Sequence, residues 1–460
     1  MKNIHLPHTS DSKAYSRNTV RRREFLFGVG ESALGAGAAC LAGSFIPFGI
    51  RRCHAAEGSE IGRAYEGWRE GELEIHSIYT GRGESTFYIF PDGTTMLLDA
   101  GDWYTDPERS VEYLPNDSRR SGEWIARYVQ RANPHGTDVD YMMASHFHVD
   151  HIGSPKATAG ITEGRGDDYH IAGLSQVAET IHFDWSYDRG YPDYNDPADP
   201  VGSPGEVNIV NYRKFLKWTM KEKGLRAEKF NVGQLDQIKL RKTPGAYDFH
   251  VRNLSANGEV WTGKGEKTFD FLAGWNTRLP NENPLSIGLL MTYGNFRYFT
   301  GGDTDTNVHV NNTIIPVEAA VGNAAGPVDV CKANHHGVGN ASGEGFIKGV
   351  QPRVMTFNIW VTAQADSRVL DRFFSDGDNP IPSGERLACP TMFPKFRQEE
   401  IANAPWCGRV ATMGGHIVVK VFDGGRQFKV YYLSARDEKS TVTAVFGPFE
   451  STGTQRAAKG

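Results

Sequence analysis

Residues 141–153 read Tyr-Met-Met-Ala-Ser-His-Phe-His-Val-Asp-His-Ile-Gly. The apolar run 141–144 predicts a buried strand. Three histidines and one aspartate follow it, at His146, His148, His151 and Asp150. Imidazole and carboxylate are the ligands that Zn²⁺ and similar divalent cations prefer, and in a turn at a strand end these side chains can face two neighbouring positions. The stretch therefore predicts a site for two metal ions. Read alone, it is also compatible with a polar loop whose histidines are unrelated.

The chain before this stretch alternates short apolar runs and turns. Gly81-Arg82-Gly83-Glu84-Ser85 interrupts the first of these runs as a turn. A helix is predicted from Ser121 to Arg131, with Ser121 as its N-cap. The strand before this helix ends in Asp99, and a carboxylate directly after a buried apolar run often marks the functional edge of a sheet. The predicted strands are 73–79, 86–90 and 95–98.

The second half of the chain repeats this pattern. The predicted strands are 247–254, 285–293, 296–300 and 328–333. One of them ends in Gly301-Gly302-Asp303, where the aspartate by itself would be an ordinary turn residue. The last runs into Asn334-His335-His336-Gly337, and two adjacent histidines face different ways.

The order of these motifs resembles the metallo-β-lactamase superfamily. More narrowly, it is similar to the soluble hydrolase domain of bacterial DNA-internalisation competence proteins and their secreted relatives. The resemblance rests on the strand–GRGES–strand–turn–strand–LLDAGD–helix–strand–HFHVDHIG order and on the later GGD and HHG motifs, and it covers about residues 70–435. It implies an α/β fold, the αββα sandwich of two mixed sheets flanked by helices. Arg82 and Glu84 depart from the family's Gln and Asp, which leaves the role of the first loop open.

The resemblance also implies ligands and roles. Two divalent metals, Zn²⁺ first and Mn²⁺ or Fe as alternatives, would be held by His146, His148, Asp150, His151, Asp303 and His336. Asp303 would bridge the metals, Asp150 would also orient the nucleophile, and Asp99 would orient the ligands from behind. His335 would protonate the leaving group. The opposite assignment of His335 and His336 stays open.

One feature of many superfamily members, a third histidine between the first motif and the bridging aspartate, is missing from the sequence. The candidates His170, His182 and His250 lack its glycine-rich context. Competence-type domains also commonly lack this residue. The first metal would then rest on the first two motif histidines, Asp303 and water.

Residues of about 155–250 are expected to form a long lid-like insertion. The segment 180–194 is rich in aromatic and acidic side chains, and a helix is predicted at 210–223. Long loops of this kind often act as lids or recognition loops. Rings and carboxylates together suit a cationic ligand group. The alternative is a surface insertion with its own aromatic cluster. The candidate lid residues are Asp184, Trp185, Tyr187 and Tyr191.

Residues 1–56 resemble a twin-arginine export signal. Arg21-Arg22-Arg23 precedes the apolar pair Phe25-Leu26, an uncharged Gly/Ala-rich run follows at 32–50, and small residues near Ala56 suit cleavage. We expect a periplasmic or secreted bacterial protein, exported folded by the twin-arginine machinery, without a stable membrane span. A linker is expected at 57–70. An uncleaved membrane anchor and a lipoprotein are the weaker alternatives.

Charge and cysteine content limit the partners. Residues 1–56 hold eight Lys/Arg and three Asp/Glu of the 50 and 55 in the chain, so the remainder has 42 basic and 52 acidic side chains, a formal charge of −10. This balance disfavours nucleic acid as a partner, because phosphate backbones require a positive footprint. Cys331 is expected as a buried thiol, whereas Cys389 and Cys407 could pair in an oxidising compartment.

These observations favour an exported binuclear metal-dependent hydrolase. It would use a metal-bridged hydroxide on a phosphodiester of a small or envelope-derived substrate. A lactamase or lactonase on the same fold is the first alternative, and its mark would be a three-histidine first site. A non-catalytic metal-binding recognition protein is the second. The hydrolase domain is expected at 71–435, followed by a C-terminal tail at 436–460.

Overall fold

The computed structural model describes residues 60–103, 108–155, 164–165, 168–200, 206–275, 281–310, 313–375, 377 and 379–459. The candidate export signal at 1–56 lies outside these described residues, as does the start of the expected linker. Within the described ranges, no helix combines the length and the apolar character needed to cross a bilayer.

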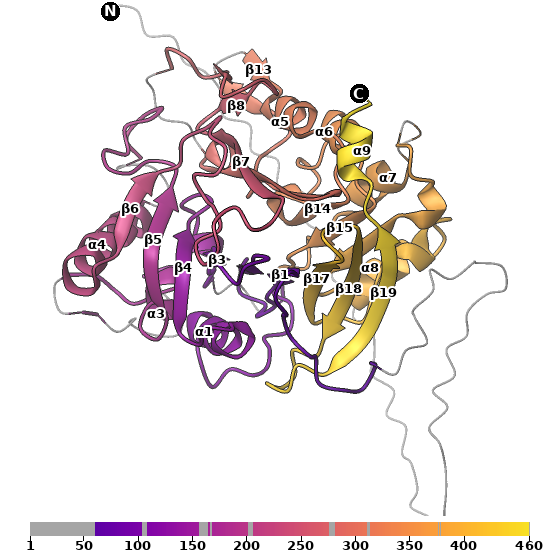
Figure 1. Ribbon diagram of the computed structural model, residues 1–460, viewed down its shortest axis with the longest axis horizontal. Coiled ribbons are helices and arrows are strands. Elements are labelled where there is room, and N and C mark those ends of the chain that lie inside the picture. Colours follow the sequence, from indigo (N-terminus) through magenta and orange to yellow (C-terminus); the bar gives the residue numbers. More distant parts are fainter. Residues whose placement is uncertain are drawn as a thin grey trace, which may run out of the picture. The chain divides into compact units, whose positions relative to one another are not determined.

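Nine strands of the described chain form the first sheet (Figure 1). In spatial order they are β19 (Val442–Glu450), β18 (Gln427–Leu433), β17 (His416–Phe422), β1 (Leu73–Ser77), β2 (Thr86–Ile89), β3 (Thr95–Leu98), β4 (Asp138–Met143), β5 (His182–Asp188) and β6 (Arg226–Lys229). Neighbours run antiparallel from β19 to β3 and parallel from β3 to β6. Parallel neighbours need crossover connections, so helices enter the chain where the sheet becomes parallel.

The second sheet is also mixed. Its eight strands are β16 (Leu387–Pro390), β15 (Val354–Phe357), β14 (Val330–Lys332), β11 (Phe296–Thr300), β10 (Gly288–Tyr293), β7 (Phe249–Ala256), β8 (Glu259–Trp261) and β9 (Thr268–Asp270). Neighbours are parallel from β16 to β11 and antiparallel from β11 to β9. A small separate hairpin joins β12 (Val308–Val310) to β13 (Thr313–Ile315).

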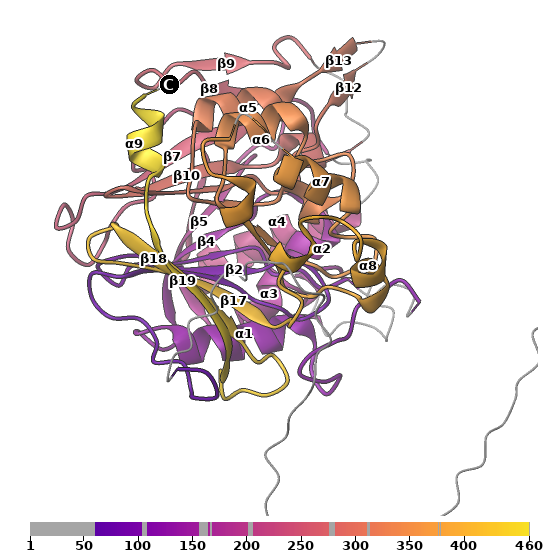
Figure 2. The ribbon, with the colours of Figure 1, turned by 90° about the vertical axis from the view of Figure 1, so that its right-hand side faces the viewer.

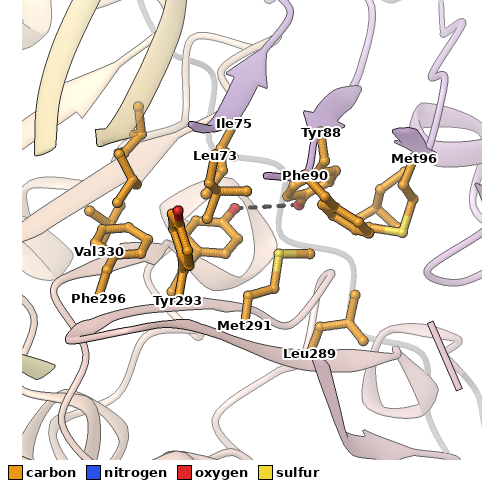
Figure 3. Packing of buried hydrophobic residues seen from close by; sticks show 14 of the residues in the cluster. Leu73, Ile75, Tyr88, Phe90, Met96, Leu289, Met291, Tyr293, Phe296 and Val330 are labelled. Carbon is orange, nitrogen blue, oxygen red and sulfur yellow. Dashed lines mark hydrogen bonds between the residues drawn. The ribbon is translucent and has the colours of Figure 1, made fainter. Parts of the chain in front are cut away.

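The two sheets share one apolar core (Figure 3). Leu73 and Ile75 of β1 and Tyr88 of β2 come from the first sheet, and Met291 and Tyr293 of β10 come from the second; all are buried. Alternate residues of each strand point to this core because successive side chains of a strand face opposite sides of the sheet. Full burial of one such side chain contributes about 1.5–3 kcal/mol, so the shared core is a main source of stability.

Helices cover the outer faces of both sheets (Figures 1 and 2). The first sheet packs against α1 (Ser121–Ala132), α3 (Leu174–Val177) and α4 (Glu206–Lys223). The second packs against α5 (Val317–Ala325), α6 (Glu344–Val350) and α7 (Ser367–Ser375). Shorter helices are α2 (Val149–Ile152), α8 (Lys395–Glu400) and α9 (Gly453–Ala457). The order helix, sheet, sheet, helix is compatible with the expected αββα sandwich.

The described part of residues 155–250 differs from the expected lid. β5 and β6 extend the first sheet beside β4, and α4 covers them. Successive residues of β5 face opposite sides of the sheet, as in any strand, and β4 and β6 flank β5 within the sheet. The aromatic and acidic segment 182–188, which was expected to be part of a lid, is therefore a strand of the first sheet.

The expected linker and C-terminal tail also contribute to the first sheet. β19 pairs with β18, and its residues Val442, Ala444 and Phe446 are buried. The Tyr65 N–H donates to the carbonyl of Ser440. The Tyr65 ring lies edge-on to the ring of Tyr431 in β18, with 5.1 Å between the ring centroids. The apolar alternation of β19 is the signal that places this segment in the sheet.

The start of α1 differs in detail from the prediction. Arg120, one residue earlier than expected, is the N-cap. The Ser121 hydroxyl donates to the carbonyl of Gly101 at 2.6 Å, so it ties the helix to the loop after β3. The Glu123 carboxylate accepts the Arg120 N–H at 3.2 Å, which is one half of a capping box.

No disulfide joins the three cysteines of the described chain to one another. Cys331 is buried, which confirms the expectation for it. Cys389 on β16 and Cys407 are not joined to each other.

His416, the first residue of β17, is a buried neutral imidazole. Its Nδ1 accepts the Tyr79 N–H at 3.1 Å, and its ring packs against Tyr128 at a centroid distance of 4.4 Å. Burial lowers the pKa of His416 to about 3. The unfolded chain takes up a proton here below pH of about 6.5, whereas the folded chain does not, so this contribution to stability is complete above that pH and decreases below it.

We therefore predict that stability falls between pH 7 and pH 5 because of His416. His416→Asn keeps an acceptor and does not titrate, so the wild type should lose about 2 kcal/mol more than this variant over the interval. Urea unfolding in the presence of EDTA measures the difference. His309→Asn, at an exposed histidine, is the control and should follow the wild type. Equal pH dependence in the wild type and His416→Asn would refute the assignment.

Candidate metal centre

The ends of four strands from both sheets carry the candidate ligands. Asp99 follows β3, and the motif histidines and α2 follow β4. Asp303 follows β11 by three residues, and His336 lies in the short 3-10 helix η2 (Asn334–Gly337) after β14. Because β3 and β4 are parallel, and β11 and β14 are parallel, each pair delivers its side chains to one edge of its sheet. The side-chain distances show that the two edges meet.

Asp303 lies in the middle of the cluster. Its Oδ2 is 3.1 Å from His151 Nε2, 3.2 Å from His336 Nε2 and 3.9 Å from His146 Nε2. These four side chains are at most 1% exposed. One carboxylate oxygen thus faces three imidazoles, two from the first sheet and one from the second.

The two other predicted ligands lie on either side of this carboxylate. Nδ1 of His148 is 3.1 Å from Nε2 of His146. Oδ2 of Asp150 is 3.1 Å from Nε2 of His336 and 3.7 Å from Nε2 of His151. The structure therefore brings all six predicted ligands together, as one pair and one trio beside a shared aspartate.

The donor atoms fit a divalent cation. Atoms bound to one Zn²⁺ at about 2.0–2.2 Å lie roughly 3.4 Å from one another, close to the spacings above. His151 Nε2 and Asp303 Oδ1 are buried without hydrogen-bond partners among the described residues, as is Glu84 Oε1. Such orphaned buried atoms are costly unless something else binds them. The cluster of Glu84, His151, Asp303 and His336, whose ligand atoms lie within 4.8 Å of one another, could therefore hold metal ions.

Glu84 and Lys332 are site residues that the sequence analysis did not assign. Lys332 Nζ lies 2.7 Å from Glu84 Oε2 and 3.8 Å from Asp303 Oδ1, and it donates to the Gly302 carbonyl at 2.8 Å. Both side chains are at most 1% exposed. The only sequence signals were the departure of Glu84 from the expected aspartate and a lysine at the end of an apolar strand directly before the HHG motif.

The loop that carries Glu84 requires glycine. Gly83 has φ +143°, and a Cβ there would lie 2.5 Å from the Asp150 carbonyl oxygen and 2.7 Å from the Gly101 Cα. The Glu84 N–H donates to the same Asp150 carbonyl at 2.8 Å. The GRGES turn therefore packs backbone to backbone against the ligand loop, which brings the Glu84 carboxylate into the cluster.

Contacts from behind orient the imidazoles. Asp99 Oδ2 lies 2.8 Å from His151 Nδ1, and it also accepts the Ser145 hydroxyl at 2.6 Å. His336 Nδ1 lies 2.9 Å from the Asn358 carbonyl oxygen. When Nδ1 donates in this way, Nε2 keeps its lone pair for the centre, as is usual for metal-binding histidines.

His335 and His336 face different ways, as expected for neighbours. Both have positive φ, 47° and 53°, which non-glycine residues rarely adopt and which often occurs at functional sites. His336 is buried, whereas the His335 side chain is 24% exposed. His335 Nδ1 lies 2.9 Å from Asp305 Oδ1, and its Nε2 lies 3.8 Å from Asp303 Oδ2. His335 therefore lies at the open side of the cluster.

Mutual charges shift the pKa values of these groups. Burial alone would raise the pKa of Asp303, but the neighbouring imidazoles, His151 foremost, hold it well below its usual value. Burial would lower the pKa of His336, but Asp303 and Asp150 raise it to about 9. Burial, together with the nearby imidazoles, holds the pKa of His146 well below its usual value, so this ring is neutral.

The candidate lid residues lie outside the cluster. Asp184 pairs with Arg241 at 3.3 Å, and Trp185 stacks on Tyr187 at a centroid distance of 6.4 Å. Tyr187 belongs to the core between the sheets, and Tyr191 lines a separate cavity beside α4. These positions follow from β5 being a paired strand rather than a loop.

The three histidines considered for the first metal are also elsewhere. His182 and His250 are 47% and 46% exposed in their side chains, and their neighbours are Asp184 and Asp236. His170 is exposed at an isolated bridge with Gly164. Within the described part of the chain, none of them joins His146 and His148.

We predict that Lys332 compensates buried negative charge at this centre. Lys332→Met leaves the Glu84 carboxylate without its cation, so the free energy of unfolding in EDTA should fall by about 3–5 kcal/mol. The double variant Glu84→Gln/Lys332→Met should lose less than the sum of the single variants. Zn²⁺ should restore part of the stability of Lys332→Met, because a dication replaces the lost ammonium. Urea unfolding with EDTA and with Zn²⁺ measures these effects.

Lys395→Met is the matched control, since that side chain is 90% exposed. It should change stability by no more than about 0.5 kcal/mol in either condition. Additive losses in the double variant, or the same loss for Lys332→Met with and without Zn²⁺, would contradict the prediction.

Comparison of the chain with known proteins adds no family to this description. No protein-family model matches the sequence, and no curated protein matches it significantly. The geometry of the cluster and the order of the motifs along the chain are therefore the basis for any assignment of function.

Proposed function

We propose that this protein is a metal-dependent hydrolase of the metallo-β-lactamase type, with a binuclear centre. The observation that carries the proposal is the convergence of six imidazole and carboxylate groups from the ends of strands in both sheets, with Asp303 Oδ2 within 3.1–3.9 Å of three imidazoles. The motif order described above supports the same assignment. A polar loop with unrelated histidines would not join one buried cluster with distant residues, and the buried members here are His146, Asp150, His151, Asp303 and His336.

The side chains divide into two ligand groups. His146 and His148 would hold one divalent cation, and Asp150, His151 and His336 the other, with Asp303 between them. When bound, the cations supply Lewis-acid activation of water and neutralise charge that develops on the substrate. Zn²⁺ suits these ligands best, and Mn²⁺ or Fe is compatible with them.

His335 is the proposed proton donor to the leaving group. It is the more exposed of the two adjacent histidines, and Asp305 orients its Nδ1 at 2.9 Å. The proton would be held on Nε2, the ring nitrogen that faces Asp303. Asp150 orients the nucleophile as well as serving as a ligand, since its Oδ2 lies between His151 and His336.

A phosphodiester is the preferred substrate class, on a small or envelope-derived molecule. The first ligand group has no third histidine within the described residues, which supports the competence-type subgroup over a lactamase or lactonase. The formal charge of −5 for the chain disfavours a polymeric nucleic acid substrate. We also propose that the protein is exported by the twin-arginine machinery to the periplasm or outside the cell. The support for this is the sequence of residues 1–56, which resembles a twin-arginine signal.

We predict that Asp303→Asn lowers metal content and hydrolysis together. Loss of the shared carboxylate should reduce bound metal from about two equivalents to about one or fewer, and hydrolysis of bis-p-nitrophenyl phosphate by at least roughly 10²–10³-fold. Elemental analysis of the purified protein and the release of p-nitrophenol measure these effects. His182→Gln, at an exposed histidine that was considered as a ligand, is the matched control and should retain both metal and rate.

A substrate panel distinguishes the alternatives. The Zn²⁺-loaded protein should cleave the phosphodiester faster than p-nitrophenyl phosphate, a β-lactam or a lactone. Cleavage of a lactam or lactone with no effect on the phosphodiester would replace the proposal by the lactamase or lactonase alternative. Two equivalents of metal without hydrolysis of any panel member would favour a non-catalytic metal-binding recognition protein.

A further inference from the structure

A cavity lies against the outer face of α4, and none of its described lining residues belongs to the candidate metal centre. Its volume is about 690 Å³, within the range of about 300–1,000 Å³ that is typical of small-ligand sites. In Figure 1, α4 is the helix beside β5 and β6. The cations that line the cavity are Arg213, Lys214, Lys217 and Lys221.

These cations share one face of α4 because they recur at helical spacing. Arg213, Lys217 and Lys221 are four residues apart, and Lys214 is adjacent. Like charges at this spacing repel each other and destabilise a helix. No carboxylate is among the described residues that line the cavity. The opposite face of α4 supplies the packing against the sheet, so the basic face is not needed for the fold.

Two of the four cations lack an internal partner. Lys221 pairs with Glu222 at 2.6 Å, and the Arg213 guanidinium lies 4.8 Å from the ring centroid of Tyr194. Lys214 and Lys217 are exposed, and within the described residues neither has an ion-pair partner. The cavity therefore offers uncompensated positive charge although the whole chain is negative, at −5.

The rest of the wall is apolar. Val210 and Met220 lie on the same helix face as the cations, and Leu216 lies beneath them. The rings of Tyr191 and Tyr194 come from the turn after β5. A ligand with one charged end and an apolar body would match both parts of this wall.

We propose that this cavity binds a small amphiphilic anion, with a carboxylate, sulfate or phosphate at Lys214 and Lys217 and an apolar body against Val210, Met220 and Tyr191. The sign of the charge is opposite to the cationic group considered for the segment 180–194. Two of the three carboxylates of that segment, those of Asp184 and Asp188, are already engaged.

Three contacts show how these two carboxylates are used. Asp188 accepts the N–H groups of Gly190 and Tyr191 at 2.8 and 2.7 Å, and Asp184 pairs with Arg241 at 3.3 Å. Neither carboxylate lines the cavity. The proposed anion site at α4 shares no described residue with the metal centre. A test of anion binding is therefore independent of the proposed hydrolase activity.

Calorimetric titration of the full chain with decyl sulfate, below the concentration at which it forms micelles, tests the proposal. We expect one site whose affinity falls with added salt. Lys214→Gln/Lys217→Gln should weaken binding at least about tenfold, because both contacts between an ammonium and the anionic group are lost. Met220→Gln should weaken it several-fold by removing apolar contact.

Lys264→Gln/Lys267→Gln is the matched control. These two lysines are exposed in the turn between β8 and β9, so decyl sulfate affinity should stay within about twofold of the wild type. Equal weakening in both double variants would refute the site. In the wild-type chain, decyl sulfate should also protect Lys214 and Lys217 from acetylation, as read by mass spectrometry, while Lys264 and Lys267 react as before. Absence of this protection would equally refute it.

A neutral detergent and anionic vesicles distinguish the proposed anion site from a merely apolar cavity and from a membrane-docking face. Decyl maltoside should bind at least about tenfold more weakly than decyl sulfate, since it lacks the charge. Equal binding would mean a merely apolar cavity and overturn the proposal. Binding to phosphatidylglycerol vesicles without binding of monomeric decyl sulfate would also overturn it, in favour of a membrane-docking face.

Discussion

A carboxylate buried among imidazoles from two different sheets is the constraint on which the rest of the structure depends. Asp303 comes from the second sheet and His146 and His151 from the first, so the cluster exists only when the two sheets are packed together. Charges removed from water are tolerated only when they are paired closely. The shared core supplies the free energy that holds the sheets together, and close backbone packing at Gly83 sets how near the loops approach. Fold and candidate site therefore form together.

Much of the fold could be predicted from local sequence. The strand at Thr95–Leu98 and the strand at Phe296–Thr300 begin and end where the apolar runs do, because turn residues bound both. The ligand set could be assembled because each ligand directly follows such a run, and strand ends at one edge of a sheet lie together. Segments that join an existing sheet were harder to assign. β5 is aromatic and acidic, so only its pairing partners reveal it as a sheet strand, whereas the apolar alternation of β19 is a local signal for its pairing with β18.

Contacts between single residues that are far apart in the sequence could not be predicted from local sequence. Glu84 and Lys332 are 248 positions apart, and neither belongs to a spaced motif that would identify the other. The cavity at α4 shows the same limit for charge. The chain has a formal charge of −5 but carries a local group of four cations at this cavity. Helical spacing places the cations on one face of α4, and the turn with Tyr191 and Tyr194 forms the opposite wall.

The Glu84–Lys332 pair has a consequence for how the buried negative charge is compensated. Lys332 acts as an internal counter-ion at a point where the carboxylates of Glu84 and Asp303 would otherwise repel each other. Many small metal-binding domains are unfolded until their metal arrives. Here the Lys332 ammonium, which is part of the chain, already offsets part of this negative charge, so the two carboxylates do not depend on a metal ion as their only compensating cation.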